Sequence, residues 1–171
     1  MNEVEIRWAT FDDCLQIGQV HNEAYISAYE SMIPETYLRM LTSKERQFDC
    51  EHSLRNGLEK TAIILVDGII IGLLILGVGK EKEFDETFAE IKAIYLLKPH
   101  WGKGYGKKLL NWGLSRLREL GYLNVYLWVL KENTNAIHVY NKMGFRFDGE
   151  ERLIERGKEC IQLRCSMAIR A

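Results

Sequence analysis

The stretch KPHWGKGYGKKLL, from Lys98 to Leu110, places glycine at alternate positions 102, 104 and 106 directly before a leucine-rich segment. Glycine has no Cβ atom, so it adopts positive φ without strain and lets a ligand approach the main chain closely. The first turn of a helix also presents unpaired N–H groups and the positive end of the helix dipole. We therefore predict a turn between a strand and a helix that binds an anionic group such as a phosphate.

The segments on either side of this glycine turn have clear periodic patterns. FAEIKAIYLL, Phe88 to Leu97, precedes the turn and predicts a strand. Leucines recur at helical spacing after the turn, and Gly121 follows the last of them as a typical residue after a helix end. NVYLWVL, residues 124–130, then predicts a buried strand.

The N-terminal half adds strands and helices to this centre. VEIRWAT, residues 4–10, predicts a strand. Thr10 is the expected N-cap of a helix that follows and runs through Tyr29. Residues 34–58 have a polar helical pattern that begins at Pro34. Two apolar runs around Asp67-Gly68 follow, and they predict a hairpin.

The C-terminal part predicts a helix and a final pair of strands. ENTNAIHVYNKMGF, residues 132–145, reads as a short helix, and residues 145–153 and 158–169 read as a terminal hairpin. The predicted order is β-α-α-β-β-β-α-β-α-β-β, a mixed α/β fold with a largely antiparallel sheet. No repeat or linker divides the chain, so we expect a single domain over residues 1–171.

Composition indicates a globular protein with a small-molecule partner. The 171 residues are 47% hydrophobic and 27% charged, and the formal net charge is -1. Without a global basic field, neither nucleic acid nor an anionic membrane is an expected partner. The N-terminus lacks the pattern of a signal peptide and no apolar run could span a bilayer, so we expect a cytoplasmic protein. The four cysteines have no C-x-x-C spacing, which predicts reduced core thiols and no metal site.

The glycine turn fits neither of two common nucleotide-binding motifs. A P-loop has four residues between its first glycine and Gly-Lys-Ser/Thr, whereas Gly102 and Gly106 enclose three residues and Lys107 is followed by Lys108. The dinucleotide fingerprint needs G-x-G-x-x-G and an acid after the next strand, but that strand ends in Leu130-Lys131. A tight turn without a ligand is the alternative for the glycines taken alone.

WGKGYG, residues 101–106, and NTNAIHVYNKMGF, residues 133–145, together resemble two motifs of the GNAT superfamily of acetyl-CoA-dependent N-acetyltransferases. The family's pyrophosphate loop is Gln/Arg-x-x-Gly-x-Gly/Ala, and its second motif is Asn-x-x-Ala-x-x-x-Tyr-x-x-x-Gly-Phe. The resemblance is specific over residues 88–147 and rests on element order elsewhere. Trp101 departs from the usual Gln or Arg, and we expect it to alter the rim of the site more than its function.

The resemblance implies acetyl-CoA as the cosubstrate, without a metal. In the family the loop binds the phosphates, while the main chain of the preceding strand, freed at a bulge, binds pantetheine and the oxyanion. On this chain the implied residues are Ile94, Tyr95, Leu96, Gly102, Lys103, Gly104, Tyr105, Gly106, Lys107, Asn133 and Asn135. The lysines, Lys108 included, alternatively form a solvated helix face, and either asparagine alternatively caps a helix.

Acyl transfer to an amine requires a base, because an alkylammonium with a pKa near 10.4 is protonated at neutral pH. Glu90 is a lone acid in an apolar strand directly before the loop, where burial would raise its pKa. Some family members use a glutamate at this distance as general base, and others rely on a water chain. The structural alternative is an outward-facing Glu90 paired with Lys92, two positions along the strand.

Tyr140 is the candidate acid that protonates the leaving thiolate, because the family's tyrosine on this helix approaches the CoA sulfur. Its alternative role is aromatic packing, and His138 on the same helix reads as a surface or packing residue. The resemblance thus implies an N-acetyltransferase that moves an acetyl group to a primary amine of a small molecule or peptide, by direct attack in a ternary complex. A non-catalytic acyl-CoA-binding regulatory module and a nucleotide-binding domain are the rivals.

The sequence does not identify the acceptor. In this family the first helices and the terminal hairpin shape the acceptor pocket. Glu23, Glu30 and Glu35 on the first helices would suit a cationic amine, but they equally suit solubilising charge. A homodimer is compatible with the resemblance.

Overall fold

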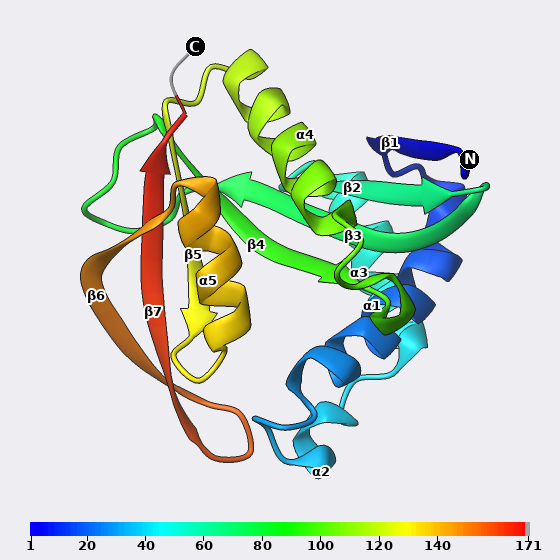
Figure 1. Cartoon of the computed structure of the whole chain (residues 1–171), viewed down its shortest axis with the longest axis horizontal. Helices are drawn as coiled ribbons and strands as arrows, with labels where there is room; N and C mark the ends of the chain where they lie inside the picture. The colour runs from blue at the N-terminus through cyan, green and yellow to red at the C-terminus, as the bar shows by residue number, and fades with distance from the viewer. Residues whose placement is uncertain (170–171) are drawn as a thin grey trace.

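The computed structural model describes residues 1–169, in which seven strands form one sheet in the order β1-β2-β3-β4-β5-β7-β6 (Figure 1). Only β4 and β5 run parallel to each other. The expected mixed α/β fold with a largely antiparallel sheet is therefore confirmed. The strands are β1 (Val4–Trp8), β2 (Glu59–Val66), β3 (Ile69–Val78), β4 (Phe88–Leu96), β5 (Asn124–Leu130), β6 (Arg146–Glu155) and β7 (Glu159–Ala168).

Helices cover both faces of the sheet. In the view of Figure 1, α1 (Cys14–Tyr29) and α3 (Ser43–Asn56) lie behind it, and α4 (Tyr105–Glu119) and α5 (Thr134–Met143) lie in front. Residues 61–66 of β2 are all buried, as expected for a central strand covered on both sides. The α4 leucines pack on one face, and Ile17 of α1 packs with Leu73 of β3 on the other.

Residues 34–58 form two helices rather than the single one predicted. The short α2 (Glu35–Leu38) ends before Thr42, and α3 begins directly after it. The Thr42 hydroxyl accepts a hydrogen bond from the Glu45 main-chain N–H at 3.2 Å, and the Glu45 carboxylate accepts one from the Thr42 N–H at 2.7 Å. This reciprocal capping satisfies free donors of a first turn and starts a new helix.

The predicted hairpin is confirmed. β2 and β3 are joined by Asp67 with φ 51° and Gly68 with φ 77°, both in the left-handed region that a tight two-residue hairpin turn requires. The four cysteines are buried and free, as predicted for reduced core thiols. Among residues 1–169, no helix is long and apolar enough to cross a membrane.

β4 and β5 pair over only part of their length. The parallel pairing joins Phe88–Ile91 to Asn124–Leu127, while β4 continues to Leu96 and β5 to Leu130. On its other side β4 contains an extra residue, Lys92, where the register against β3 shifts. Such a bulge bends its strand. The sheet therefore splits between β4 and β5, and the glycine turn follows directly after β4.

Candidate active site

The split leaves main-chain groups of β4 without a partner strand. The Leu97 N–H donates to the Ile71 carbonyl of β3 at 2.9 Å, and hydrogen bonding alternates along an antiparallel pair. The main-chain groups of Tyr95 consequently face β3. Those of Ile94 and Leu96 face the split, on the side where β5 has diverged.

The Trp101 side chain hydrogen-bonds one of the main-chain groups that face the split. Its indole Nε1–H donates to the Leu96 carbonyl at 2.8 Å. The side chain is 41% exposed and lies at the mouth of the split. Trp101, which stands where the family usually has Gln or Arg, thus ties the start of the glycine turn to the end of β4.

The glycine turn has the backbone that an anion site requires. Gly102 has φ 72° and Gly104 has φ 83°, and a Cβ atom built on either would meet nothing within 4 Å. α4 begins at Tyr105, and the first N–H of the turn region to bond within the helix is that of Lys108, to the Gly104 carbonyl at 3.1 Å. Within residues 1–169, the main-chain N–H groups of residues 102–107 have no hydrogen-bond acceptor. These donors are directed outward at a helix N-terminus.

The polar side chains implied at the cofactor site differ in their surroundings. Lys103, Lys107 and Lys108 are exposed, which suits either a phosphate contact or a solvated face. The Asn133 side chain accepts a hydrogen bond from the Ala136 N–H at 3.3 Å and is the N-cap of α5. Asn135 is exposed on the first turn of α5.

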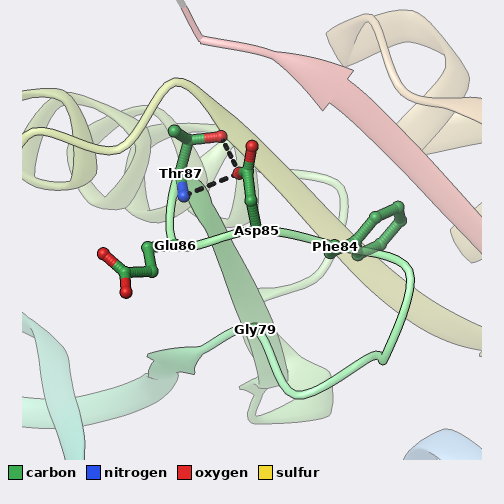
Figure 2. A pocket seen from close by; sticks show the side chains of 5 residues that line it. All are labelled: Gly79, Phe84, Asp85, Glu86 and Thr87. Carbon is green, nitrogen blue, oxygen red and sulfur yellow. Dashed lines mark hydrogen bonds between the residues drawn. The ribbon is translucent and has the colours of Figure 1, made fainter.

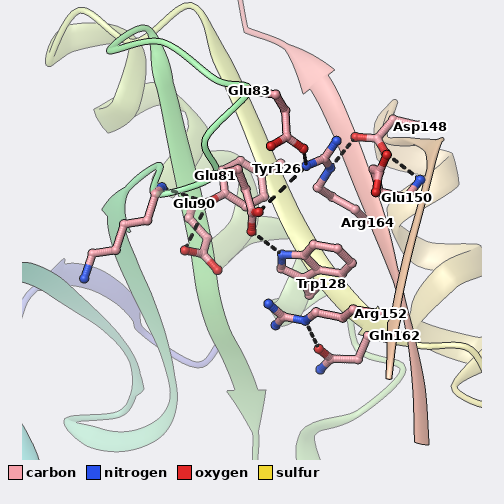
Figure 3. A network of polar contacts seen from close by, with 11 residues as sticks. Glu81, Glu83, Glu90, Tyr126, Trp128, Asp148, Glu150, Arg152, Gln162 and Arg164 are labelled. Carbon is pink, nitrogen blue, oxygen red and sulfur yellow. Dashed lines mark hydrogen bonds and ion pairs between the residues drawn. The ribbon is translucent and has the colours of Figure 1, made fainter. Parts of the chain in front are cut away.

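Glu90 lies at the closed end of the split. It pairs across the sheet with Gly77 of β3 and Tyr126 of β5. The Tyr126 hydroxyl donates to Glu90 Oε2 at 3.3 Å and accepts from the Lys80 main-chain N–H at 3.1 Å (Figure 3). The hydroxyl thus acts as donor to Glu90 and as acceptor from Lys80, and it holds the Glu90 carboxylate in one orientation.

The surroundings of Glu90 change its pKa in opposing directions. Burial raises the pKa of Glu90 above its usual value, although Lys92, Tyr126 and Arg152 act against this shift. Lys92 does not pair with Glu90 as in the structural alternative, because its ammonium bonds Glu59 Oε1 at 2.7 Å. Burial also raises the pKa of Tyr126, to about 12, so its hydroxyl keeps its proton at neutral pH.

Tyr140 lies on α5, on the other side of the split from β4. Its ring meets Phe145 edge-on with centroids 5.8 Å apart, so it does pack. Burial, and after it the neighbouring hydroxyl of Tyr29, raise the pKa of Tyr140. The Tyr29 hydroxyl in turn lies 3.4 Å from that of Tyr95 on β4. Tyr140 therefore retains its proton and lies near a group of tyrosines from α1 and β4.

A polar network fixes the loop between β3 and β4 next to Glu90 (Figure 3). The buried Arg164 of β7 forms ion pairs with Glu83 of this loop and, at 2.7 Å, with Asp148 of β6. The Trp128 indole donates to Glu81 at 2.9 Å. The network thus joins the loop to β5, β6 and β7 and positions Glu81 among the charges that act on Glu90.

The same loop lines an open surface depression of about 510 Å³, shown in Figure 2. Gly79, Phe84, Asp85, Glu86 and Thr87 line it, and Asp85 accepts hydrogen bonds from the N–H and hydroxyl of Thr87. All lining residues belong to one loop, and none comes from the split or from α4. Its position argues against a role in cofactor binding.

Tyr126 and Arg152 are site residues that the sequence did not suggest. Alternation in NVYLWVL places Tyr126 and Trp128 on one face of β5. Their position relative to Glu90 depends on the parallel register of β4 and β5, which no local pattern contains. Arg152 reaches this region from β6 and stacks on Trp128, with its guanidinium carbon 4.1 Å from the ring centroid.

Residues 19–145 match the family model described as the acetyltransferase (GNAT) family. An uncharacterized N-acetyltransferase, YuaI of Bacillus subtilis (strain 168), is 29% identical over 137 residues, covering 78% of this chain and 76% of YuaI. The spermine/spermidine N(1)-acetyltransferase of the same strain is 30% identical over 87 residues, which are 49% of this chain and 57% of that protein.

Solved structures share the fold over nearly the whole chain. The PaiA N-acetyltransferase of Thermoplasma acidophilum, crystallised with coenzyme A, superposes with a TM-score of 0.79 at 20% identity, over 97% of this chain and 99% of that one. YncA of Salmonella typhimurium, crystallised with acetyl-CoA, gives 0.74 at 19% identity, over 97% and 94%. The family match spans most of the chain, and the chain belongs to the acetyltransferase (GNAT) family of acyltransferases.

Proposed function

We propose that the protein transfers the acetyl group of acetyl-CoA to a primary amine of a small molecule or peptide, by direct attack in a ternary complex. One observation carries this proposal: the split between β4 and β5 has free main-chain groups along β4, an anion-binding turn at its mouth and a half-buried carboxylate at its closed end. A reaction between a phosphorylated thioester donor and an amine needs these three features: main-chain groups that bind the donor, N–H groups that bind its phosphates, and a base for the amine.

The residues present fit acetyl-CoA. The unpartnered N–H groups of residues 102–107 would hold its phosphates, with Lys103 and Lys107 exposed beside them. Ile94 would pair with the pantetheine amides through its free N–H and carbonyl, and Leu96 through its N–H, because the Leu96 carbonyl already accepts from Trp101. Asn135 is exposed and free to contact the pantetheine, whereas Asn133 already caps α5. When bound, the cosubstrate supplies an activated acetyl thioester.

Glu90 would remove the proton that prevents the amine from attacking. Its raised pKa makes it a better proton acceptor than an ordinary exposed carboxylate, and Tyr126 orients it. Free N–H groups of β4 near the bulge at Lys92 would stabilise the negative charge that develops on the acetyl oxygen. Tyr140, which holds its proton at neutral pH, would deliver it to the departing sulfur.

The relatives support a small amine as acceptor. One is named for spermine and spermidine, and another is the mycothiol acetyltransferase of Actinosynnema mirum, which is 34% identical over 71 residues. Both matches cover less than half of this chain, so they support the class of acceptor and no particular compound.

The test is thiol release from acetyl-CoA with a panel of primary amines, run beside thermal unfolding with acetyl-CoA, CoA, ATP and NAD. A ligand that binds only the native state raises the unfolding temperature by mass action. We expect stabilisation by acetyl-CoA and CoA alone, together with amine-dependent thiol release. Stabilisation without turnover on any amine would favour the non-catalytic acyl-CoA-binding module instead.

A further inference from the structure

A pocket of about 320 Å³ lies between α1, α3 and the strands β2 and β3, outside the split. α3 contributes residues from one helical stripe, with spacings of three and four. The interior is formed by Ile17, His21, Arg46, Cys50, Thr61 and Ile75. We call this cavity the Arg46 pocket.

Arg46 is a buried cation without a counterion. The residue is 7% exposed, and within residues 1–169 no carboxylate oxygen lies within 4.0 Å of its guanidinium. One Nη group bonds His21 Nε2 at 3.0 Å, and the Tyr25 ring lies below the guanidinium carbon at 4.5 Å. The Nε–H is buried and has no acceptor. A buried guanidinium without an ion-pair partner destabilises the folded protein unless a bound ligand or a partner balances its charge.

His21 is uncharged, so it neither adds to the positive charge of Arg46 nor balances it. A guanidinium only donates hydrogen bonds, so His21 Nε2 must accept and the ring is neutral with its proton on Nδ1. Burial and the neighbouring Arg46 lower the pKa of His21 to about 3. The His21 ring also stacks on Tyr95 of β4 with centroids 5.2 Å apart. The interior therefore carries one positive charge without a direct ion-pair partner, and the exposed acids Glu45 and Asp49 of α3 act on it only from a distance.

The rim of the pocket has the opposite charge. Asp49 lies one turn along α3 from Arg46 and is exposed, and Glu59 is held by Lys92 at 2.7 Å. These acids would repel a dianion more strongly than a monoanion. A guanidinium also matches the planar, two-oxygen geometry of a carboxylate. The charge distribution thus favours a monocarboxylate over a phosphate.

We propose that the Arg46 pocket is a carboxylate-binding site and, resting on the proposed acetyltransferase function, that the acceptor is an amine that also carries a carboxylate. The pocket and Glu90 lie on the same face of the sheet, because Glu59, Gly77 and Glu90 form one cross-strand row. Two strand spacings separate Glu59 from Glu90, about 10 Å. Glu59 marks the rim of the pocket, so this spacing sets the scale of the span that an extended ω-amino acid or a short peptide would bridge.

The side chain of Lys92 lies between Glu59, at the rim of the pocket, and Glu90. A Cβ atom built on Gly77 would come within 2.7 Å of Lys92 Cε, so this ammonium crosses the sheet directly over the glycine to reach Glu59. Arg152 acts on Glu90 from the other side. The charges around the proposed base are mixed, because Lys92 is paired with Glu59 and Glu81 acts against Arg152.

The test compares ω-amino acids of increasing length with their carboxamides in the thiol-release assay, in the wild type, Arg46→Gln and Arg46→Lys proteins. Arg55→Gln, on the same helix but exposed, is the matched control. We expect the acid-to-amide ratio of kcat/KM to exceed ten in the wild type and Arg55→Gln. It should fall about tenfold or more in Arg46→Gln, the loss expected for one charge-assisted hydrogen bond. Arg46→Lys keeps the positive charge and should retain part of the preference for the acid over the amide. It keeps the test decisive if the glutamine variant fails to fold.

Binding of butyrate and of inorganic phosphate, measured by NMR titration of the same proteins, separates this inference from the proposed function. Arg46-dependent butyrate binding, strengthened in Asp49→Asn, supports the carboxylate site even if no amine releases thiol. That outcome overturns the acetyltransferase proposal together with the acceptor assignment that rests on it. Thiol release with equal ratios in the wild type and a folded Arg46→Gln protein overturns the inference and leaves the acetyltransferase proposal intact. Arg46-dependent binding of phosphate without butyrate also overturns the carboxylate assignment.

Discussion

The Tyr126 hydroxyl donates to Glu90 Oε2 at 3.3 Å while it accepts from the Lys80 N–H at 3.1 Å. One phenol thus connects the β3–β4 loop, β4 and β5 at the closed end of the split. A hydrogen bond to a carboxylate stabilises its ionised form, whereas burial destabilises that form. Burial is the larger effect here, so the pKa of Glu90 is raised but less than it would be without Tyr126.

Replacing Tyr126 with Phe should shift the acidic limb of the kcat/KM profile to higher pH. The hydrogen bond lowers the pKa of Glu90, so its loss raises that pKa and keeps the base protonated further toward neutrality. Stability should fall by about 0.5–1.5 kcal/mol, because the Lys80 N–H also loses its partner. Tyr122→Phe on the opposite face of the sheet is the control for ring-hydroxyl loss. An unshifted profile in folded Tyr126→Phe would remove Tyr126 from the positioning of the base.

Glu90→Gln should lower activity and raise stability together. Loss of a general base reduces kcat/KM by about 10²–10⁴-fold, with the largest deficit at pH values where the acceptor is mostly ammonium. The pKa of Glu90 is raised on folding, so ionising it destabilises the native protein above the unfolded-state pKa. The neutral amide avoids this penalty, and the gain over wild type should therefore be larger at pH 7 than at pH 4. Denaturant unfolding at the two pH values and pH–rate profiles measure both effects.

A structural role predicts the reverse combination for Glu90. If the side chain served only the sheet, the glutamine variant would lose stability and keep a pH–rate curve superimposable on that of the wild type. That result would assign proton removal to water or another residue.

Tyr140→Phe should reduce kcat without weakening acetyl-CoA binding. The change removes the transferable proton and keeps the ring that packs on Phe145. General-acid assistance contributes about 10²–10⁴-fold, and the drop should approach this range where chemistry limits the rate. Because burial raises the pKa of Tyr140, no loss of activity from its ionisation is expected near neutral pH. Tyr29→Phe is the informative companion, since a larger effect there would move the acid to α1.

The elements of the fold could be predicted because their signals are local. Apolar periodicity identified β4, α4 and β5, and Asp67-Gly68 identified the hairpin. The division of residues 34–58 was missed although Thr42 and Glu45 have the spacing of a capping box. The helical pattern on both sides of that signal masked the four-residue interruption.

The contacts of the site depend on long-range pairing and could not be read locally. Alternation along the strand offers a Glu90–Lys92 pair as the structural alternative, but the bulge redirects Lys92 to Glu59, which is 33 positions away in the sequence. Arg46 reads as surface charge in a polar helix, and its burial follows only from the packing of α3 against α1. Tyr126 lies beside Glu90 because β5, which follows α4, pairs with β4 in a parallel register. No short sequence motif encodes that register.

Gly104→Ala should weaken acetyl-CoA binding beyond its effect on folding, and Gly121→Ala supplies the matched control. Both glycines have left-handed backbones, with φ 83° and 92°, and at both a Cβ would meet nothing within 4 Å. Each substitution should therefore destabilise the fold similarly, by about 1–2 kcal/mol.

Only the Gly104 Cβ would project beside the free N–H groups at the start of α4, where it would obstruct a phosphate; Gly121 follows the other end of the same helix. We expect the Kd for acetyl-CoA, measured by calorimetry on folded protein, to rise about tenfold or more for Gly104→Ala, as for loss of one charge-assisted hydrogen bond. It should stay unchanged for Gly121→Ala. Equal affinities of the two variants would mean that the phosphates bind elsewhere and that the glycine turn serves only the chain reversal between β4 and α4.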